Sequence, residues 1–495
     1  MKYRSLARSF HADRSNDAFN NHAKLARQRL EADSTFRTGV VTPLGELFAA
    51  TPRETSMLTE KILLAERRVS RLWNQIPGVM RWDYIRHSIS EELFATNEME
   101  GVRSTRKETQ EAVEAADKAR KDGDDPKARF SEFAKLYLNL TDKDSALPAG
   151  IADIRDIYDK VVLDEINESD KPDGELFRKG DDPKARFSEF AKLYLNLTDK
   201  DSALPAGIAD IRDIYDKVVL DEINESDKPD GELFRKGDVE IQGPHGLAIH
   251  NGVKGEGNIG ALLTDMIHLA TSDEIPRLQS AIMSHFLFEY VHPFYDGNGR
   301  TGRYLLALYL NHDLTMPTVL SLSRTIAENK NAYYKAFMEA EDKLNCGELT
   351  LFVNTILGFI RKAQDELIDE LEVRVDQLDK GRAVCDQLER KHGLSAKAVS
   401  ILYGVIQEEM FDSTKSMTLN DAAYHIRLSK QSARKYVGEL MDAGLAIQSG
   451  KRPLKIRASE SLKGILEAGM GEDAGEHGGK TQQEETETAH EGDPA

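Results

Sequence analysis

The segment His292–Arg303 has the sequence HPFYDGNGRTGR and follows the apolar run AIMSHFLFEYV. It brings a histidine, an aspartate, a Gly-Asn-Gly turn and two arginines close together. Polar and charged groups are costly to bury unless they have partners, and glycines allow backbone conformations that are closed to other residues. A helix-loop-helix with a simple capped turn leaves these groups unexplained, so we expect a functional loop between two apolar helices.

The residue types in this loop predict a phosphate site. Backbone N–H groups at a helix N-terminus form a concavity that binds anions. Arg300 and Arg303 are three residues apart and therefore share one face of the first helical turn. Asp296 offers a hard oxygen ligand for Mg²⁺, and His292 is suited to accept a proton from a hydroxyl.

The loop resembles the signature of the Fic family, HxFx[D/E]GNGRxxR. Every fixed position is matched, by His292, Phe294, Asp296, Gly297, Asn298, Gly299, Arg300 and Arg303. The resemblance implies a mostly α-helical Fic-type core that transfers AMP from ATP to a protein hydroxyl. It also implies a general base at His292, a Mg²⁺ ligand at Asp296, and an α-phosphate cradle formed by Asn298 with the amides of Gly297 and Gly299. Arg300 and Arg303 would hold the remaining phosphates, and Phe294 would anchor the loop.

The same resemblance implies a β-hairpin flap, which we expect at about Leu233 to Asn251, where GELFRKG and DVEIQGPHGLAIHNG predict two short strands around a turn. Such a flap holds a target segment by strand addition. An ordinary surface hairpin is the alternative. Tyr333 and Tyr334 stand where the family often places an aromatic residue near the adenine, although their helical spacing fits a core equally well.

A second family pattern lies upstream. Fic proteins are often restrained by a helix with the pattern [S/T]xxxE[G/N], and TNEMEG matches it at Thr96, Glu100 and Gly101. The resemblance implies that Glu100 pairs with Arg303 and keeps that guanidinium from the γ-phosphate of ATP. An exposed helix glutamate is the alternative, and in some family members the same glutamate helps to remove AMP.

Residues 124–180 are repeated without change at 181–237. Repeats that form a solenoid usually differ at surface positions and need more than two units, so we interpret the pair as a recent duplication or an assembly error. Our expected organisation has five parts. These are an N-terminal helical region with the inhibitory helix (1–122), the catalytic core with the duplication (123–365), a helical connector (366–393), a winged-helix domain (394–462) and a disordered acidic tail (463–495).

The C-terminal domain is predicted from apolar residues that fit two helices on either side of the turn residues LS, and from GLAIQSGKRPLKIRAS, which predicts a two-stranded wing. The apolar residues are Ala422, Ala423, Ala433, Val437, Leu440 and Met441. Winged helices bind DNA or proteins, and we leave both open. Basic residues occur on the expected recognition helix and in the wing. They are Lys430, Arg434, Lys435, Lys451, Arg452, Lys455 and Arg457.

The composition argues against several classes of function and site. A net charge of −19 argues against non-specific nucleic-acid binding by the whole molecule. We found no signal-peptide core and no membrane span, so we expect a cytoplasmic location. Cys346 and Cys385 form no CxxC pair and predict neither a disulfide nor a zinc site.

The leading hypothesis is an autoinhibited protein adenylyltransferase that uses ATP and Mg²⁺. Its partners would be a protein with a Ser, Thr or Tyr hydroxyl, the chain itself, or a second copy in a homodimer. The alternatives are a DNA-binding regulator whose Fic core senses nucleotide, and a Fic enzyme that removes AMP or uses another nucleotide donor.

Overall fold

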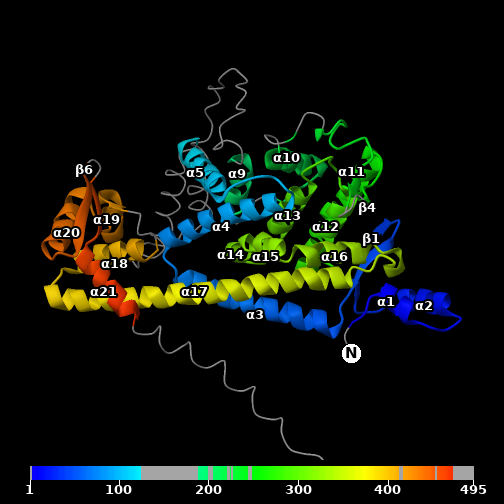
Figure 1. The fold of residues 1–495 in the computed structure, drawn as a ribbon, viewed down its shortest axis with the longest axis horizontal. Coiled ribbons are helices and arrows are strands. Elements are labelled where there is room, and N and C mark those ends of the chain that lie inside the picture. The colour runs from blue at the N-terminus through cyan, green and yellow to red at the C-terminus, as the bar shows by residue number, and fades with distance from the viewer. Residues whose placement is uncertain are drawn as a thin grey trace, which may run out of the picture. The chain divides into compact units, whose positions relative to one another are not determined.

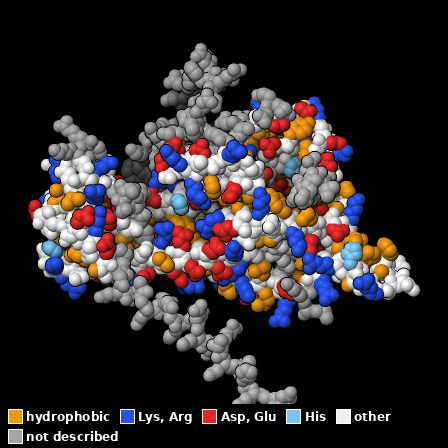
Figure 2. Space-filling view, in the orientation of Figure 1, with side chains coloured by type: hydrophobic (Ala, Val, Ile, Leu, Met, Phe, Trp, Pro, Cys, Tyr) orange, Lys and Arg blue, Asp and Glu red, His pale blue; other side chains and the backbone are white. Residues whose placement is uncertain are grey.

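The computed structural model describes residues 3–123, 188–198, 204–219, 223, 227–242, 248–411, 416–451 and 454–471. Two compact units are present. Unit 1 comprises Met1–Ser70 and Arg81–Leu367, and unit 2 comprises Arg71–Met80 and Ile368–Ala495. No helix within the described residues is long and apolar enough to span a bilayer. Figure 2 shows basic and acidic side chains interspersed over the visible face, as expected for a chain rich in both.

Unit 1 is built around two buried helices, α12 (Arg277–Val291) and α13 (Asn298–Leu310), labelled in Figure 1. Thirteen of the fifteen residues of α12 and twelve of the thirteen residues of α13 are buried. A helix that is covered on all sides lies in a core, and both apolar stretches were predicted to flank the loop. The loop 292–297 therefore joins two core helices, and within it Asp296 is exposed.

Further helices, three of which continue into unit 2, lie wholly or partly in unit 1. They are α1 (Leu6–Ala12), α2 (Ala18–Leu30), α3 (Arg53–Gln75), α4 (Gly78–Met99), α5 (Arg106–Gly123), α9 (Ser188–Asn196), α10 (Ile208–Val219), α11 (Glu256–Ala270), α14 (Met316–Leu320), α15 (Leu322–Glu328), α16 (Lys330–Glu341), the 3₁₀ turn η3 (Lys343–Asn345) and α17 (Thr350–His392). Helix α17 is continuous, so the expected connector at 366–393 is the second half of a helix that begins in the core.

The N-terminal region is not wholly helical, which corrects our expectation for 1–122. Strands β1 (Thr35–Thr42) and β2 (Gly45–Ala50) form an antiparallel hairpin. The β-branched and aromatic residues of TFRTGVVT favour this conformation, and Gly39, at φ 71°, lies where the register shifts. The pattern analysis missed the hairpin because it considered only helical spacing there.

The expected flap is shorter than predicted. Strands β3 (Glu240–Gln242) and β4 (Ala248–Asn251) pair in antiparallel fashion. GELFRKG, at 231–237, forms no strand, and within it Phe234 and Arg235 are buried. The turn residues 243–247 lie outside the described residues.

The second copy of the duplication supplies part of the core. Its helix α9 contributes Phe190 and Tyr194, its helix α10 contributes Tyr215 and Val219, and Phe234 follows; all five are at most 1% exposed. The first copy, 124–180, lies outside the described residues. Every described contact made by the repeat therefore comes from 181–237.

Unit 2 contains a helix-turn-helix beside a small sheet. Its elements after α17 are α18 (Ala396–Phe411), β5 (Met417–Thr418), α19 (Leu419–Ile426), α20 (Lys430–Asp442), β6 (Ala446–Lys451), β7 (Leu454–Ala458) and α21 (Glu460–Gly471). The sheet order is β5-β7-β6 and both pairings are antiparallel.

Helix α21 corrects the expected start of the tail. We expected disorder from 463, but the helix runs to Gly471 and buries Leu462 and Leu466 in the core of unit 2. These two residues are four apart and share one helix face. Residues 472–495 lie outside the described residues.

Deletion of 124–180 tests whether the second copy suffices. The connection from α5 to α9 shortens by those residues while all described contacts are kept, and a shorter connection costs less entropy to close. We expect thermal unfolding at an equal or higher temperature than the full chain. A midpoint lower by more than about 5 °C, a change of roughly 1 kcal/mol or more, would show that the first copy stabilises the fold.

Candidate functional site

The loop between α12 and α13 is held in two left-handed backbone positions. His292 ends α12 at φ 51° and ψ 63°, with its N–H donating to the carbonyl of Phe288 at 3.0 Å. Gly297 begins α13 at φ 79°. A left-handed conformation is strained for a non-glycine residue, and such strain persists only where surrounding contacts impose it. His292 is therefore placed by its neighbours and not by its own backbone preference.

Asn298 closes the loop. Its Oδ1 accepts the N–H of Phe294 and its Nδ2 donates to the carbonyl of Phe294, both at 2.9 Å. We expected this side chain to help cradle the α-phosphate. Each of its polar atoms makes one hydrogen bond with the loop backbone, so Asn298 holds the loop in shape, and its role toward phosphate stays a prediction.

The second repeat copy forms the floor under the loop. The ring of Phe294 is fully buried and stacks on Tyr215 of α10, with 3.5 Å between ring centroids and an interplanar angle of 11°. A Cβ added at Gly297 would lie 2.4 Å from the Cγ1 of Val219. The glycine thus allows α10 to approach the loop closely, and Phe294 is the anchor that the motif predicted.

Arg303 is the charged centre of the site and is 2% exposed. Its Nε donates to the Oγ1 of Thr96 at 2.8 Å, and one terminal nitrogen donates to the Oε1 of Glu100 at 2.8 Å and to the carbonyl of Thr96 at 3.2 Å. Burial alone would lower the pKa of Arg303, but the Glu100 carboxylate more than offsets this and the pKa is raised. Thr96 and Glu100 therefore meet Arg303, which lies 207 and 203 positions further along the sequence.

Glu100 also fills the start of α13. A Cβ added at Gly299 would lie 2.2 Å from the Oε1 of Glu100 and 3.0 Å from a terminal nitrogen of Arg303. The absence of a side chain at Gly299 leaves the space that this carboxylate occupies. Gly101 follows at φ 71° and ends the segment, since a positive φ suits the residue after a helix.

Two further carboxyl groups, those of Glu289 and Glu92, lie near Arg303, but Glu100 is its main counter-charge. Burial raises the pKa of Glu289 to about 8 and that of Glu92 to about 7. Glu289 is accordingly mostly protonated at neutral pH, and Glu92 is partly so. Glu100, which contacts the guanidinium directly, is its main counter-charge.

The proposed base lies in an environment that keeps it neutral. Burial, and then the nearby His250, lower the pKa of His292 to about 4. His250 is itself held on strand β4, where its Nε2 is 2.7 Å from the carbonyl of Tyr290 and its Nδ1 is 2.8 Å from the Oε2 of Glu341. The His292 ring is therefore unprotonated and able to accept a proton near neutral pH.

Asp296 fits a Mg²⁺ ion that is shared with a nucleotide. Its side chain is exposed, and its Oδ1 accepts the N–H of Gly297 at 2.7 Å. Among the described residues, no cluster of three or more His, Cys, Asp or Glu is placed to hold a metal. Mg²⁺ is commonly bound by one or two carboxylates together with substrate phosphates, so a single aspartate at a phosphate cradle suits it.

Of the other predicted site residues, Arg300 and Tyr333 are buried and Tyr334 is exposed. Arg300 is buried at 1% exposure. Tyr333 is also buried, and its hydroxyl is 2.7 Å from the Nε2 of His285. Tyr334 is 39% exposed, with the Lys330 ammonium 5.7 Å from its ring centroid. Tyr333 is therefore a core residue here, whereas Tyr334 is the one accessible to a ligand.

The sequence analysis missed Arg235, a fully buried arginine in the second repeat copy. Its side chain contacts the backbone at the end of α12, next to His292. A lone arginine in GELFRKG carries no periodic signal. Its position directly after the apolar residues Leu233 and Phe234 is the only hint that the sequence offers.

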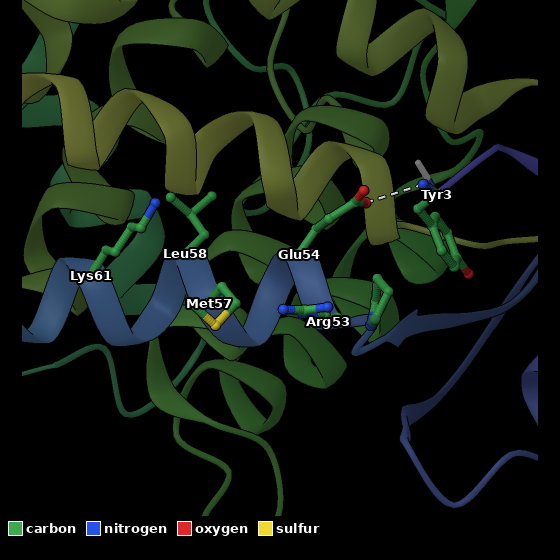
Figure 3. Close-up of a pocket in the computed structure, with 7 residues that line it drawn as sticks. Tyr3, Arg53, Glu54, Met57, Leu58 and Lys61 are labelled. Carbon is green, nitrogen blue, oxygen red and sulfur yellow. Dashed lines mark hydrogen bonds between the residues drawn. The ribbon is translucent and has the colours of Figure 1, made fainter. Parts of the chain in front are cut away.

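A separate surface pocket of about 570 Å³ lies along the first turns of α3. Figure 3 shows Tyr3, Arg53, Glu54, Met57, Leu58 and Lys61 around it. The N–H of Tyr3 donates to Glu54 at 3.1 Å across its edge. None of these residues belongs to the α12–α13 loop, so the pocket is not the site predicted by the motif.

Comparison with known proteins bears on this region. Residues 205–310 match the model of the Fic/DOC family. The chain is similar to a Fic family protein from Desulfovibrio desulfuricans G20, with 15% identity over 81% of this chain and 96% of that chain and a TM-score of 0.39.

Two further solved structures show similar values. A Fic-1 fragment from C. elegans is 15% identical over 74% of this chain and 82% of its own, with a TM-score of 0.38. A Fic domain containing signaling protein from Bacteroides thetaiotaomicron VPI-5482 is 14% identical over 62% and 97%, with a TM-score of 0.34. All three structures are at most 15% identical to this chain, and the match to the Fic/DOC family model covers residues 205–310.

Proposed function

We propose that this chain is a protein adenylyltransferase held in an inhibited state by Glu100. Proteins with a Fic domain are generally nucleotidyl transferases. The observation that supports the proposal is the contact of Glu100 with Arg303 beside Gly299, at the N-terminus of α13. The carboxylate lies where a helix N-terminus and a buried arginine both favour an anion.

In the proposed reaction, a Ser, Thr or Tyr hydroxyl of a target protein attacks the α-phosphorus of ATP. The new bond joins the hydroxyl oxygen to that phosphorus, the bond to the bridging oxygen breaks, and pyrophosphate leaves. The hydroxyl proton passes to the neutral ring of His292. Mg²⁺ held by Asp296 and phosphate oxygens would neutralise charge on the phosphates.

Inhibition follows from competition for one guanidinium. Arg303 is buried, and its hydrogen bonds are taken by Thr96 and Glu100. A γ-phosphate would have to displace Glu100 to reach it. A charge-assisted hydrogen bond contributes roughly 1.5–3 kcal/mol, which corresponds to a shift of about 10- to 150-fold between the two states.

Substitution Glu100→Gly is expected to raise AMP transfer by at least about tenfold, because Arg303 becomes free for ATP. The measurement is incorporation of label from α-labelled ATP into protein, with the chain alone and with a cell lysate as target pool. Glu98→Gly is the matched control, because Glu98 is an exposed glutamate at the end of α4, two residues before Glu100. His292→Ala in the Glu100→Gly background should abolish labelling. Equal rates for Glu100→Gly and the parent would contradict the inhibitory role.

The pH dependence of the Glu100→Gly variant tests the base. Burial lowers the pKa of His292 to about 4, and a base is active above its pKa. We therefore expect the transfer rate to stay level from about pH 8 to about pH 6, where an ordinary histidine would already be half protonated. Circular dichroism at each pH controls for unfolding. A rate that halves near pH 6.5 with the fold intact would contradict this assignment.

Unit 2 supports a second function, which we propose as DNA binding by a winged helix. Its α19–turn–α20 arrangement and its β6–β7 hairpin match that architecture. Exposed basic side chains are present on the turn, on α20 and on β7. They are Arg427, Lys430, Arg434, Lys435, Lys455 and Arg457. A basic surface in so acidic a chain is the observation that favours DNA over a protein partner.

We expect a triple variant to bind duplex DNA at least about tenfold more weakly than the parent when glutamine replaces Lys430, Arg434 and Lys435. The slope of the logarithm of the binding constant against the logarithm of the salt concentration should fall in magnitude by about 3. Gel shifts over a salt series measure both values. The control variant replaces Arg382, Arg390 and Lys391, which are also exposed cations of unit 2. Binding that is absent in the parent, or equal in both variants, would contradict the proposal.

A further inference from the structure

Arg235 is the most deeply buried cation beside the proposed base. Its side chain is 0% exposed. The Nε donates to the carbonyl of His292 at 2.8 Å, and a terminal nitrogen donates to the carbonyl of Val291 at 3.3 Å. The backbone N–H of Arg235 donates to the carbonyl of Pro293 at 3.2 Å. One residue therefore binds three consecutive carbonyls across His292.

The same guanidinium also holds the base of the flap. It donates to the carbonyl of Gly237 at 2.7 Å and to that of Val253 at 2.8 Å, which lie on the two sides of the β3–β4 hairpin. A Cβ added at Gly252 would lie 2.4 Å from a terminal nitrogen of Arg235 and 3.2 Å from the Cβ of His292. Gly252 thus allows the flap, the guanidinium and the histidine to pack against one another.

The electrostatics explain how the charge is tolerated. Among the described residues, Arg235 has no carboxylate within ion-pair distance, and burial lowers its pKa. Its partners are backbone carbonyls, two of them at the C-terminal end of α12. The last carbonyls of a helix lack intrahelical donors and carry the negative end of the helix dipole. A cation is stabilised there.

We infer that Arg235 is a positioning residue for His292, fixing the strained backbone from which the imidazole projects. This rests on the proposed function, in which His292 is the base. The left-handed conformation of His292 requires an external constraint, and its Nδ1 is buried with no hydrogen-bond partner of normal geometry among the described residues. The backbone contacts of Arg235 therefore set the direction of the ring.

The test uses the full chain in the Glu100→Gly background, with Arg235→Gln and Arg235→Lys. Lysine keeps the charge but cannot reach carbonyls in several directions, as the planar guanidinium does. We expect kcat for AMP transfer to fall about 10- to 100-fold in Arg235→Gln with KM for ATP changed less than about threefold, because the base is misplaced and the phosphate cradle is not. Arg235→Lys should recover part of kcat.

The matched control is Arg212→Gln. Arg212 binds the carbonyl of Leu233, in the same segment, at 2.8 Å and makes no described contact with residues 291–293. Its kcat should stay near that of the background. Arg178 is the same residue in the first repeat copy, so a double variant of Arg178 and Arg235 checks that the other copy does not supply the missing group.

A second readout does not depend on activity. Diethylpyrocarbonate modifies neutral imidazoles, and mass spectrometry reports its rate at each histidine. We expect His292 to react at least about fivefold faster in Arg235→Gln, as the ring loses its fixed position, with His312, an exposed histidine, as the internal reference. Thermal unfolding measures the stability of each variant.

The outcomes separate the two proposals. If the Glu100→Gly background transfers no AMP, the proposed function fails, while faster modification of His292 in Arg235→Gln still supports the positioning role. If Arg235→Gln lowers only the unfolding temperature and leaves both kcat and the modification rate of His292 unchanged, Arg235 is merely structural and the inference is wrong.

Discussion

A buried guanidinium needs partners that replace its lost hydration. At Arg303 a carboxylate is one of these partners, and this contact organises the site. Removing a charge from water is costly unless an opposite charge and hydrogen bonds replace the lost solvation. Thr96 and Glu100 provide both, so the end of α4 is tied to the first turn of α13. Gly299 has no side chain and leaves space for the carboxylate. Helix α4 is thereby linked to the loop that holds His292.

The same requirement explains why one contact can stabilise the fold and inhibit the chemistry that we propose. If Glu100 leaves, the charge of Arg303 remains buried, and Glu289, whose pKa is raised to about 8, is mostly protonated at neutral pH. An arriving anion would then be the better partner. In the function that we propose, a phosphate group of ATP meets that need, so that binding of ATP and release of Glu100 are coupled.

The features that could be predicted from the sequence are those that depend on short sequence motifs. The loop, its flanking helices and the spacing of Thr96 and Glu100 follow from short motifs, and the Arg303 contact with Glu100 was expected from them. The β1–β2 hairpin and the contacts of Asn298 with the loop backbone were not predicted, and for Tyr333 the sequence left a core position and a ligand contact equally open. The phosphate role of Asn298 was implied by the family resemblance. Its contacts with the loop backbone could not be predicted in the same way, because a buried amide takes whichever backbone partners lie within reach, and those are decided by tertiary packing.

The duplication shows most clearly where sequence reasoning ends. Two identical copies cannot be distinguished by composition or periodicity, and only their covalent neighbours differ. Arg235 binds the carbonyl of Gly237 and, across the flap, that of Val253, and residue 238 continues directly into the flap. A guanidinium that holds both sides of this hairpin and the end of α12 is most easily supplied by the copy joined to the hairpin. Chain connectivity therefore favours the second copy in the core, where Tyr215 and Val219 also support the loop.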